Sequence, residues 1–144
     1  MNVHTILRTK GKSVVTIHPD ATVERAISVL HRRGIGALVV SDDGENVVGI
    51  LSERDIVDAL GRYGAELPAV SVGEVMTCPV VTCESGDSVA ELMAEMTNRR
   101  IRHFPVVDDG RLMGIVSIGD LVKSRLDEIE YEAHSMRSFI AGAA

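Results

Sequence analysis

The sequence predicts a mixed α/β fold in which two βαββα units pack against each other with pseudo-twofold symmetry. The main observation is an internal repeat, because the stretch 15–57 matches the stretch 81–122, with one residue fewer in the second copy. In addition, each copy alternates β-branched runs with segments of helical periodicity. One copy alone would leave the apolar face of a small sheet uncovered, so the two copies are expected to cover each other.

The repeat is clearest in two motifs. The turn Asp42-Asp43-Gly44 matches Asp108-Asp109-Gly110, and the run 49–55 matches the run 114–120. The missing residue of the second copy falls in a turn, where a change of length costs little free energy. Further identical pairs are Thr16 with Thr82, Val23 with Val89, Arg33 with Arg99, and Ile35 with Ile101.

The first copy is expected to begin with a short β-branched strand at residues 14–17. A helix follows, because Thr22 is a suitable N-cap and apolar residues recur with helical spacing from Val23 to Leu30. The second copy repeats this order, with a strand at 80–81 and a helix that begins after Ser88.

A hairpin and a second helix complete each copy. Strands at 35–40 and 46–51 are joined through Asp43-Gly44, residues that tolerate positive φ. The second helix of the first copy begins at Ser52. The corresponding elements of the second copy are strands at 103–107 and 112–116 and a helix from Ser117.

The chain is expected to divide into a first unit at 1–62, a hinge-like connector at 63–74, a second unit at 75–125 and a C-terminal helix at 126–144. This helix is predicted to run from Gly119 to about Phe139. Its apolar residues alternate spacings of four and three, which is a heptad-like stripe that could cover its own domain or a partner subunit. These residues are Val122, Leu126, Ile129, Ala133, Met136 and Ile140.

Composition excludes several classes of function. The 144 residues carry a net charge of −6 with 3% aromatic residues, which argues against nucleic-acid binding. No apolar run approaches the ~20 residues of a membrane span, and the first residues lack the pattern of a signal peptide. We therefore expect a cytoplasmic protein.

Cys78 and Cys83 are expected to be small apolar fillers, so no metal site is expected. The sequence also contains no catalytic motif, so no enzyme activity is expected.

The strongest chemical signal is the motif Gly-Ile-x-Ser-x-x-Asp at the junction between a strand and a helix, present once in each copy. It ends in Ser52 and Asp55 in the first copy and in Ser117 and Asp120 in the second. Ser-x-x-Asp is a capping box, which needs no ligand. The alternative is that the carboxylate accepts hydrogen bonds from a ribose diol, as in dinucleotide-binding folds.

A second signal is the basic dipeptide Arg102-His103, which begins a strand of the second copy. Gly36-Ala37 occupies the matching place in the first copy, so the fold itself does not require the basic pair. These side chains could contact a phosphate or form a structural ion pair. Arg99 and Arg100, by contrast, are explained by the dipole at the end of a helix.

The tandem repeat, the Asp-Asp-Gly turn, the Gly-Ile-[Leu/Val]-Ser-x-x-Asp motif and the run 102–108 together resemble paired CBS domains, the Bateman module, over roughly residues 6–125. The resemblance implies a regulatory, non-catalytic module with two clefts for adenosine-containing ligands: AMP, ADP, ATP, NAD or S-adenosylmethionine. It also implies a homodimer, and a protein that the module regulates. Among these ligands AMP, ADP or ATP is expected; the alternatives are a module that binds NAD(H) or S-adenosylmethionine, and a structural dimerisation module with empty clefts.

Family site positions can be carried over by matching the motifs. The first cleft then takes Ser52 and Asp55 with Val80, Val81, Arg102 and His103. The second takes Ser117 and Asp120 with Lys10, Ser13, Val15, Gly36 and Ala37. The second cleft lacks the Arg-His pair, so its contact with phosphate would depend on Lys10 or Lys12. We therefore expect the first cleft to bind charged nucleotides more tightly.

Overall fold

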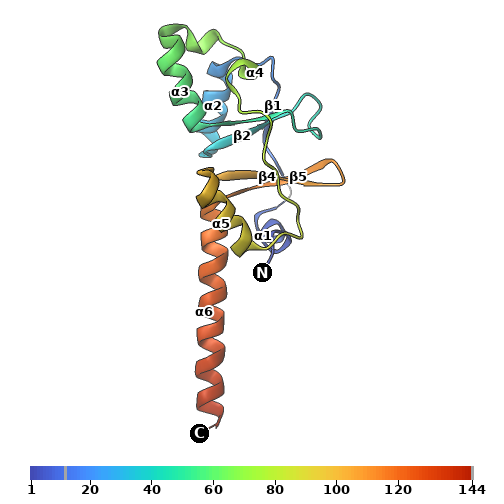
Figure 1. The fold of residues 1–144 in the computed structure, drawn as a ribbon, viewed down its shortest axis with the longest axis vertical. Coiled ribbons are helices and arrows are strands. Elements are labelled where there is room, and N and C mark those ends of the chain that lie inside the picture. Colours follow the sequence, from blue (N-terminus) through green and yellow to red (C-terminus); the bar gives the residue numbers. More distant parts are fainter. Residues whose placement is uncertain (12, 144) are drawn as a thin grey trace.

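The structure is a computed structural model that describes residues 1–11 and 13–143. Two α/β halves are stacked on each other, and the C-terminal helix projects from the lower half (Figure 1). The elements in chain order are α1 (Val3–Lys10), β1 (Thr16–Ile17), α2 (Val23–Arg33), β2 (Ala37–Val40), β3 (Gly49–Ser52), α3 (Glu53–Tyr63), the 3-10 helix η1 (Gly64–Ala69), α4 (Val72–Val75), α5 (Val89–Arg99), β4 (His103–Asp108), β5 (Arg111–Ser117) and α6 (Ile118–Ala143).

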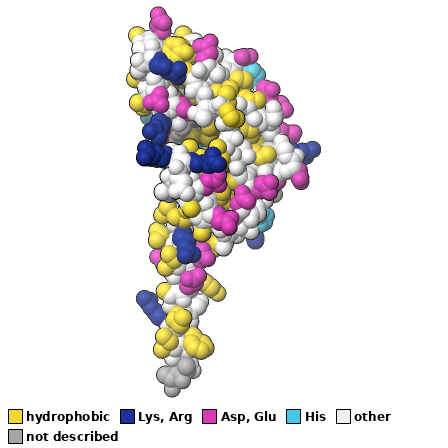
Figure 2. All heavy atoms as spheres, viewed as in Figure 1, with side chains coloured by type: hydrophobic (Ala, Val, Ile, Leu, Met, Phe, Trp, Pro, Cys, Tyr) yellow, Lys and Arg dark blue, Asp and Glu magenta, His cyan; other side chains and the backbone are white. Residues whose placement is uncertain are grey.

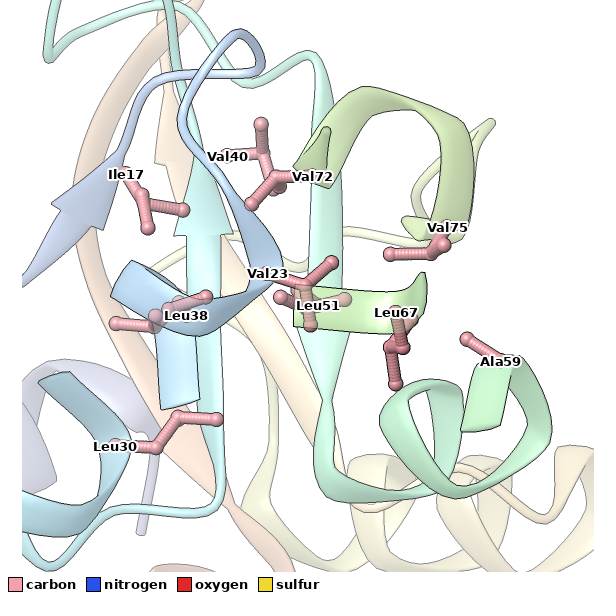
Figure 3. Packing of buried hydrophobic residues seen from close by; sticks show 11 residues of the cluster. Ile17, Val23, Leu30, Leu38, Val40, Leu51, Ala59, Leu67, Val72 and Val75 are labelled. Carbon is pink, nitrogen blue, oxygen red and sulfur yellow. The ribbon is translucent and has the colours of Figure 1, made fainter. Parts of the chain in front are cut away.

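The upper half contains a three-stranded sheet in the order β1-β2-β3, in which β1 is parallel to β2 and β2 is antiparallel to β3. The four residues of β2 are all buried, as expected for a central strand. Helices α2, α3, η1 and α4 supply the rest of its core (Figure 3). The labelled core residues are Ile17, Val23, Leu30, Leu38, Val40, Leu51, Ala59, Leu67, Val72 and Val75.

The lower half contains the hairpin β4-β5, with Phe104 fully buried in its core. The strand predicted at 80–81 is absent, and a single parallel bridge between Cys83 and Val106 takes its place. The amide of Cys83 donates to the carbonyl of Pro105, and the amide of Val107 donates to the carbonyl of Cys83. The first strand of the second copy is therefore shifted along the chain and reduced to one residue.

The predicted helix caps are confirmed. The hydroxyl of Thr22 accepts a hydrogen bond from the amide of Arg25, and the hydroxyl of Ser88 accepts one from the amide of Glu91. The turns of both hairpins use positive φ, at Gly44 in the first copy and at Asp109 and Gly110 in the second. The predicted hairpins and the helices of both copies thus follow in the expected order, although the strands of the first hairpin are shorter than expected.

The short helices that precede each copy cross to the opposite half. α1 precedes the first copy, yet Val3 and Leu7 lie in the core of the lower half. α4 precedes the second copy, yet Val72 and Val75 lie in the core of the upper half. The two crossings match, since antiparallel bridges join Asn2 to Ser88 and Thr22 to Ser71. Each half therefore depends on a segment that comes before the other half.

The segment between the copies is not the open hinge that its glycines and proline suggest. It forms η1 and α4, and Leu67 is buried against the core of the upper half. Helix α6 is also longer than predicted, ending at Ala143 instead of near residue 139. Within the described residues, no helix is long and apolar enough to cross a membrane.

Candidate functional site

A cavity of about 770 Å³ opens at the junction of the two halves. Six of the residues predicted for the first cleft line it: Ser52 and Asp55 from the upper half, and Val80, Val81, Arg102 and His103 from the lower half. Its size is within the range of pockets that hold small organic ligands. The structure thus brings together the residues that the resemblance to paired CBS domains grouped in one cleft.

Asp55 is held firmly at the wall of this cavity. Its Oδ2 accepts hydrogen bonds from the amide of Ser52 at 2.9 Å and from the hydroxyl of Ser52 at 3.1 Å, and its own amide donates to Ser52 Oγ at 3.3 Å. The Thr77 hydroxyl donates to Oδ1 at 2.7 Å. The capping box is therefore formed, and the same carboxylate also faces the cavity. A fixed carboxylate of this kind can accept hydrogen bonds from vicinal hydroxyls.

The cavity has a cationic wall contributed mainly by the end of α5 and the start of β4. Figure 2 shows Lys and Arg side chains gathered at the junction of the two halves on this face. Within the described residues, Arg99 forms an ion pair with Glu95 at 3.1 Å, and no ion pair involves Arg100 or Arg102. These two guanidinium groups are thus able to contact an anion. The arginines that line the cavity are Arg54, Arg99, Arg100 and Arg102.

His103 lies beside Gly36, where the dipeptide Arg102-His103 of the second copy meets the matching dipeptide Gly36-Ala37 of the first copy. A Cβ on Gly36 would lie 3.4 Å from His103 Cε1 and 2.7 Å from Glu53 Oε1, so glycine permits this close approach. Burial lowers the pKa of His103 below its usual range, and the charges of Lys10 and Arg102 act in the same direction. The neighbouring carboxylates of Glu53 and Asp120 oppose this shift without cancelling it. The imidazole is therefore neutral at pH 7.

Apolar side chains form another wall of the cavity and could contact a flat aromatic ring. Val80 and Val81 belong to this wall and lie outside any strand, so their backbone groups are not used in the sheet. Apolar walls with a few fixed polar groups are typical of small-molecule sites. The other apolar residues of the lining are Ile50, Val57, Pro79 and Ile101.

The second predicted cleft is arranged differently, because Lys10 closes it. The Lys10 ammonium donates to Asp120 Oδ2 at 2.6 Å and to the Ile115 carbonyl at 3.0 Å. Asp120 Oδ2 also accepts from the Ser117 amide at 2.9 Å, which completes the cap of α6. Burial acts to raise the pKa of Asp120, but the hydrogen bonds from Lys10 and Ser117 outweigh it and hold the pKa below its usual range.

The remaining residues predicted for the second cleft are not gathered in one cavity. Gly36 lines the first cavity, while Ala37 is buried in β2. Val15 lines a separate cavity of about 490 Å³ that contains neither Ser117 nor Asp120, and Ser13 is exposed. Lys12 lies outside the described residues.

Sequence reasoning missed several residues of the first cavity, above all Arg100. This residue ends α5 in the left-handed conformation, with φ 57°, where Gly34 ends α2 with φ 62°. A non-glycine residue in this conformation is strained. The alignment of the two copies places Arg100 opposite Gly34, and that exchange is the signal that could have identified it. Thr77 and Arg54 carried no comparable signal in the sequence.

The two cysteines lie in different surroundings. Within the described residues, no group of three or more His, Cys, Asp or Glu side chains could hold a metal ion. Cys83 is a buried filler, as predicted, and burial raises the pKa of its thiol to about 12. Cys78 is exposed, so the prediction that it is a buried filler is wrong.

Comparison with known proteins identifies the family. The family model of the CBS domain matches residues 8–62 and 72–127. A curated relative, the mitochondrial CBS domain-containing protein CBSX3 of Arabidopsis thaliana, is 33% identical over 95% of this chain and 70% of its own length. Among solved structures, the CBS-domain containing protein ATU1752 of Agrobacterium tumefaciens is 45% identical, with a TM-score of 0.83 over 87% of this chain and 99% of its own.

A further solved structure is similar to this chain and contains ligands. It is the CBS domain pair of protein MJ0100 in complex with 5′-methylthioadenosine and S-adenosyl-L-methionine, 30% identical, with a TM-score of 0.75 over 90% of this chain and 98% of its own. The two matched segments of the family model contain the two copies of the repeat described above, 15–57 and 81–122. This chain belongs to the CBS domain family and carries two copies of the domain.

Proposed function

We propose that this chain is a regulatory module that binds an adenine nucleotide (AMP, ADP or ATP) in the cavity between its two halves and catalyses no reaction. The observation that carries the proposal is the composition of this cavity. It places a fixed carboxylate, Asp55, in the same space as the guanidinium groups of Arg100 and Arg102 and an apolar wall. A nucleotide offers the complementary groups: a ribose diol, phosphates and a flat base.

Each part of the nucleotide has a suitable partner. The diol would donate to Asp55, which the Ser52 and Thr77 hydrogen bonds already orient. Guanidinium groups bind phosphate oxygens well because their donors are arranged in a planar fork. The base would lie against Val80 and Val81, whose backbone groups could recognise its polar edge. Little reorganisation is needed, which favours affinity.

Binding at this place would couple the two halves. The diol would be held by the upper half through Asp55, and the phosphates by the lower half through Arg102. A ligand shifts a conformational equilibrium only through its different affinity for the two states. A nucleotide that contacts both halves would bind with different affinity to two states that differ in the spacing of the halves. This supports a role as a sensor whose state is passed to a regulated protein.

We propose a stoichiometry of one nucleotide per chain. In the second copy, the carboxylate of Asp120 is occupied by the Lys10 ammonium. A ribose there would have to break this pair, and the site has no Arg-His dipeptide to compensate.

S-Adenosylmethionine is the second candidate ligand, because the related MJ0100 pair is a complex with this compound and 5′-methylthioadenosine. The cationic wall argues against it, since guanidinium groups repel a sulfonium. NAD fits the same groups of the cavity, because it carries both a diol and phosphates. Adenine nucleotides carry negatively charged phosphates and S-adenosylmethionine carries a positively charged sulfonium, so an experiment can distinguish these two classes of ligand.

A thermal-shift panel tests the proposal. AMP, ADP, ATP, NADH, S-adenosylmethionine and adenosine would each be added in excess to the full chain, with GTP as a control for the base. A ligand that binds only the folded state stabilises it by about 2.7 kcal/mol at a hundredfold excess over Kd. We expect adenine nucleotides to raise the Tm more than S-adenosylmethionine does. The absence of any response to an adenosine compound would favour a structural dimerisation module instead.

A further inference from the structure

Helix α6 extends far beyond the domain from which it starts (Figure 1). Its first turns are anchored, since Leu121 and Ser124 are buried against the lower half. Beyond them, large apolar side chains lie open to solvent. The exposed fractions are 55% for Leu126, 46% for Ile129, 60% for Met136 and 62% for Ile140. Figure 2 shows these hydrophobic surfaces continuing along the projecting part of the helix.

The exposed residues follow a heptad repeat. Leu126, Ala133 and Ile140 recur every seven residues, as do Val122, Ile129 and Met136. The two sets alternate with spacings of four and three, which are the a and d positions of a two-stranded coiled coil. The stripe lies on a different face of α6 from Leu121 and Ser124, so it is open to a second helix. The prediction that it could cover its own domain is therefore wrong for these residues.

The charges beside the stripe identify which helix would fit. With these assignments, Arg125 and Glu132 occupy g positions, and Glu130 and Arg137 occupy e positions. In a parallel in-register pair, each g residue faces the e residue five positions later on the other helix. Arg125 then faces Glu130, and Glu132 faces Arg137, so every such pair has opposite charges. A copy of this same helix is thus complementary to it.

An antiparallel pair with full overlap reverses this result. It would place Glu130 against Glu130 of the other helix, Glu132 against Glu132, and Lys123 against Arg137, all of them like charges. Shifting the antiparallel helices by one heptad relieves the repulsion but leaves apolar residues of the stripe uncovered. The parallel arrangement alone satisfies both the charges and the full stripe.

From the stripe and its charges, we infer that α6 is the interface with a second copy of this chain, as a parallel, in-register coiled coil over residues 122–140. One present contact must change, because Arg125 forms an ion pair with Glu128 of its own helix at 3.2 Å. Exposed pairs of this kind contribute little, so sharing Arg125 with Glu130 of the other copy costs little. The inference is independent of the nucleotide site, whose lining contains no residue of the stripe.

Sedimentation of the full chain tests the interface. The wild-type chain is expected to be a dimer at micromolar concentration, and the variant Ile129→Glu/Met136→Glu a monomer. Tyr131→Glu is the matched control, because Tyr131 occupies an outward position and is 73% exposed. Circular dichroism would verify that both variants remain folded. A monomeric wild type, or a double variant that remains dimeric, would overturn the inference.

A cysteine cross-link tests the orientation. In a Cys78→Ser background, Met136→Cys is expected to give a disulfide-linked dimer, because d positions face each other only in a parallel in-register pair. Ser138→Cys, on the outer face, is the control and should not cross-link. Glu132→Arg should weaken the dimer about tenfold, and adding Arg137→Glu should restore it. A dimer without the Met136→Cys cross-link would overturn the parallel arrangement.

Discussion

The ammonium of Lys10 lies 2.6 Å from Asp120 Oδ2, and in the other half of the molecule the Thr77 hydroxyl contacts the matching Asp55 carboxylate through its other oxygen, Oδ1. The likeness extends to a second contact. The Ile50 carbonyl accepts from the Thr77 amide at 2.8 Å, and the equivalent Ile115 carbonyl accepts from Lys10 Nζ. One lysine side chain thus replaces a threonine hydroxyl and a backbone amide, and its charge neutralises the carboxylate that a second ligand would need.

Lys10→Met is expected to lower the free energy of unfolding by about 1 kcal/mol at pH 7, because the pair is partly exposed, with 41% of the Lys10 side chain accessible. The pKa of Asp120 is depressed, so its contribution is present above 3.8, the usual pKa of an aspartate, and is lost as the pH falls below it. The difference between wild type and variant should therefore shrink below pH 3.8. Urea titrations at pH 7 and pH 3 would measure it, with Lys123→Met as the control. A difference that does not depend on pH would contradict the assignment to Asp120.

Arg102→Met is expected to weaken ATP binding about tenfold or more while changing adenosine binding little. The methionine retains apolar bulk but removes the charged donors that contact phosphate, and hydrogen bonds to charged groups contribute about 1.5–3 kcal/mol. Isothermal titration calorimetry with both ligands would measure the effect. Arg8→Met, an exposed arginine of α1, is the matched control. Equal losses for ATP and adenosine would indicate a structural role for Arg102.

Nucleotide binding is expected to take up a proton at His103. The pKa of the imidazole is depressed in the free protein, mainly by burial, so it is neutral at pH 7. Phosphates nearby would raise that pKa and favour the charged form. Titrations at pH 7 in buffers of different ionisation enthalpy would reveal the uptake, which His103→Asn should abolish. An uptake that survives in this variant would assign the proton to another group.

The depressed pKa of His103 also affects the stability of the protein without ligand. A histidine whose pKa is depressed in the folded state contributes stability above 6.5, the usual pKa of a histidine, and this contribution is lost as the pH falls below that value. The unfolding free energy of the wild type should therefore decrease between pH 7 and pH 5 more steeply than that of His103→Asn. Parallel slopes would contradict the depressed pKa.

Leu7→Ala is expected to destabilise the whole chain by about 2–5 kcal/mol, because Leu7 is only 5% exposed and lies in the core of the lower half. Leu60→Ala is the control, since this leucine is 55% exposed and its loss should cost within about 0.5 kcal/mol. Denaturant titration would compare the two. A mild effect of Leu7→Ala would mean that α1 is not part of the core of the lower half.

The order of elements could be predicted because local signals agree with the fold. Thr22 and Ser88 cap helices in both copies, and the Asp-Gly turns form hairpins with positive φ. The strand at 80–81 was wrong for a physical reason: these residues follow Pro79 along the wall of the cavity, and the bridge to β4 forms later, at Cys83. Strand propensity alone does not show whether residues 80–81 or Cys83 pair with β4.

The candidate site was predictable only in part. Asp55 and Arg102 could be placed in one cleft because the motifs resemble those of paired CBS domains, in which each cleft combines residues of both copies. The closure of the second cleft by Lys10 depends on a helix crossing from the other end of the chain, which no local pattern reports. Arg100 was assigned to a helix dipole because its left-handed conformation is not visible in the sequence.

Calorimetric titration of an adenine nucleotide into wild type, Asp55→Ala and Asp120→Ala tests the central claim most directly, with Asp58→Ala, an exposed residue of α3, as the control. We expect one nucleotide per wild-type chain, a loss of affinity of about tenfold or more for Asp55→Ala, and nearly unchanged affinity for Asp120→Ala. Two nucleotides per chain, or equal losses from both aspartate variants, would contradict a single site between the halves.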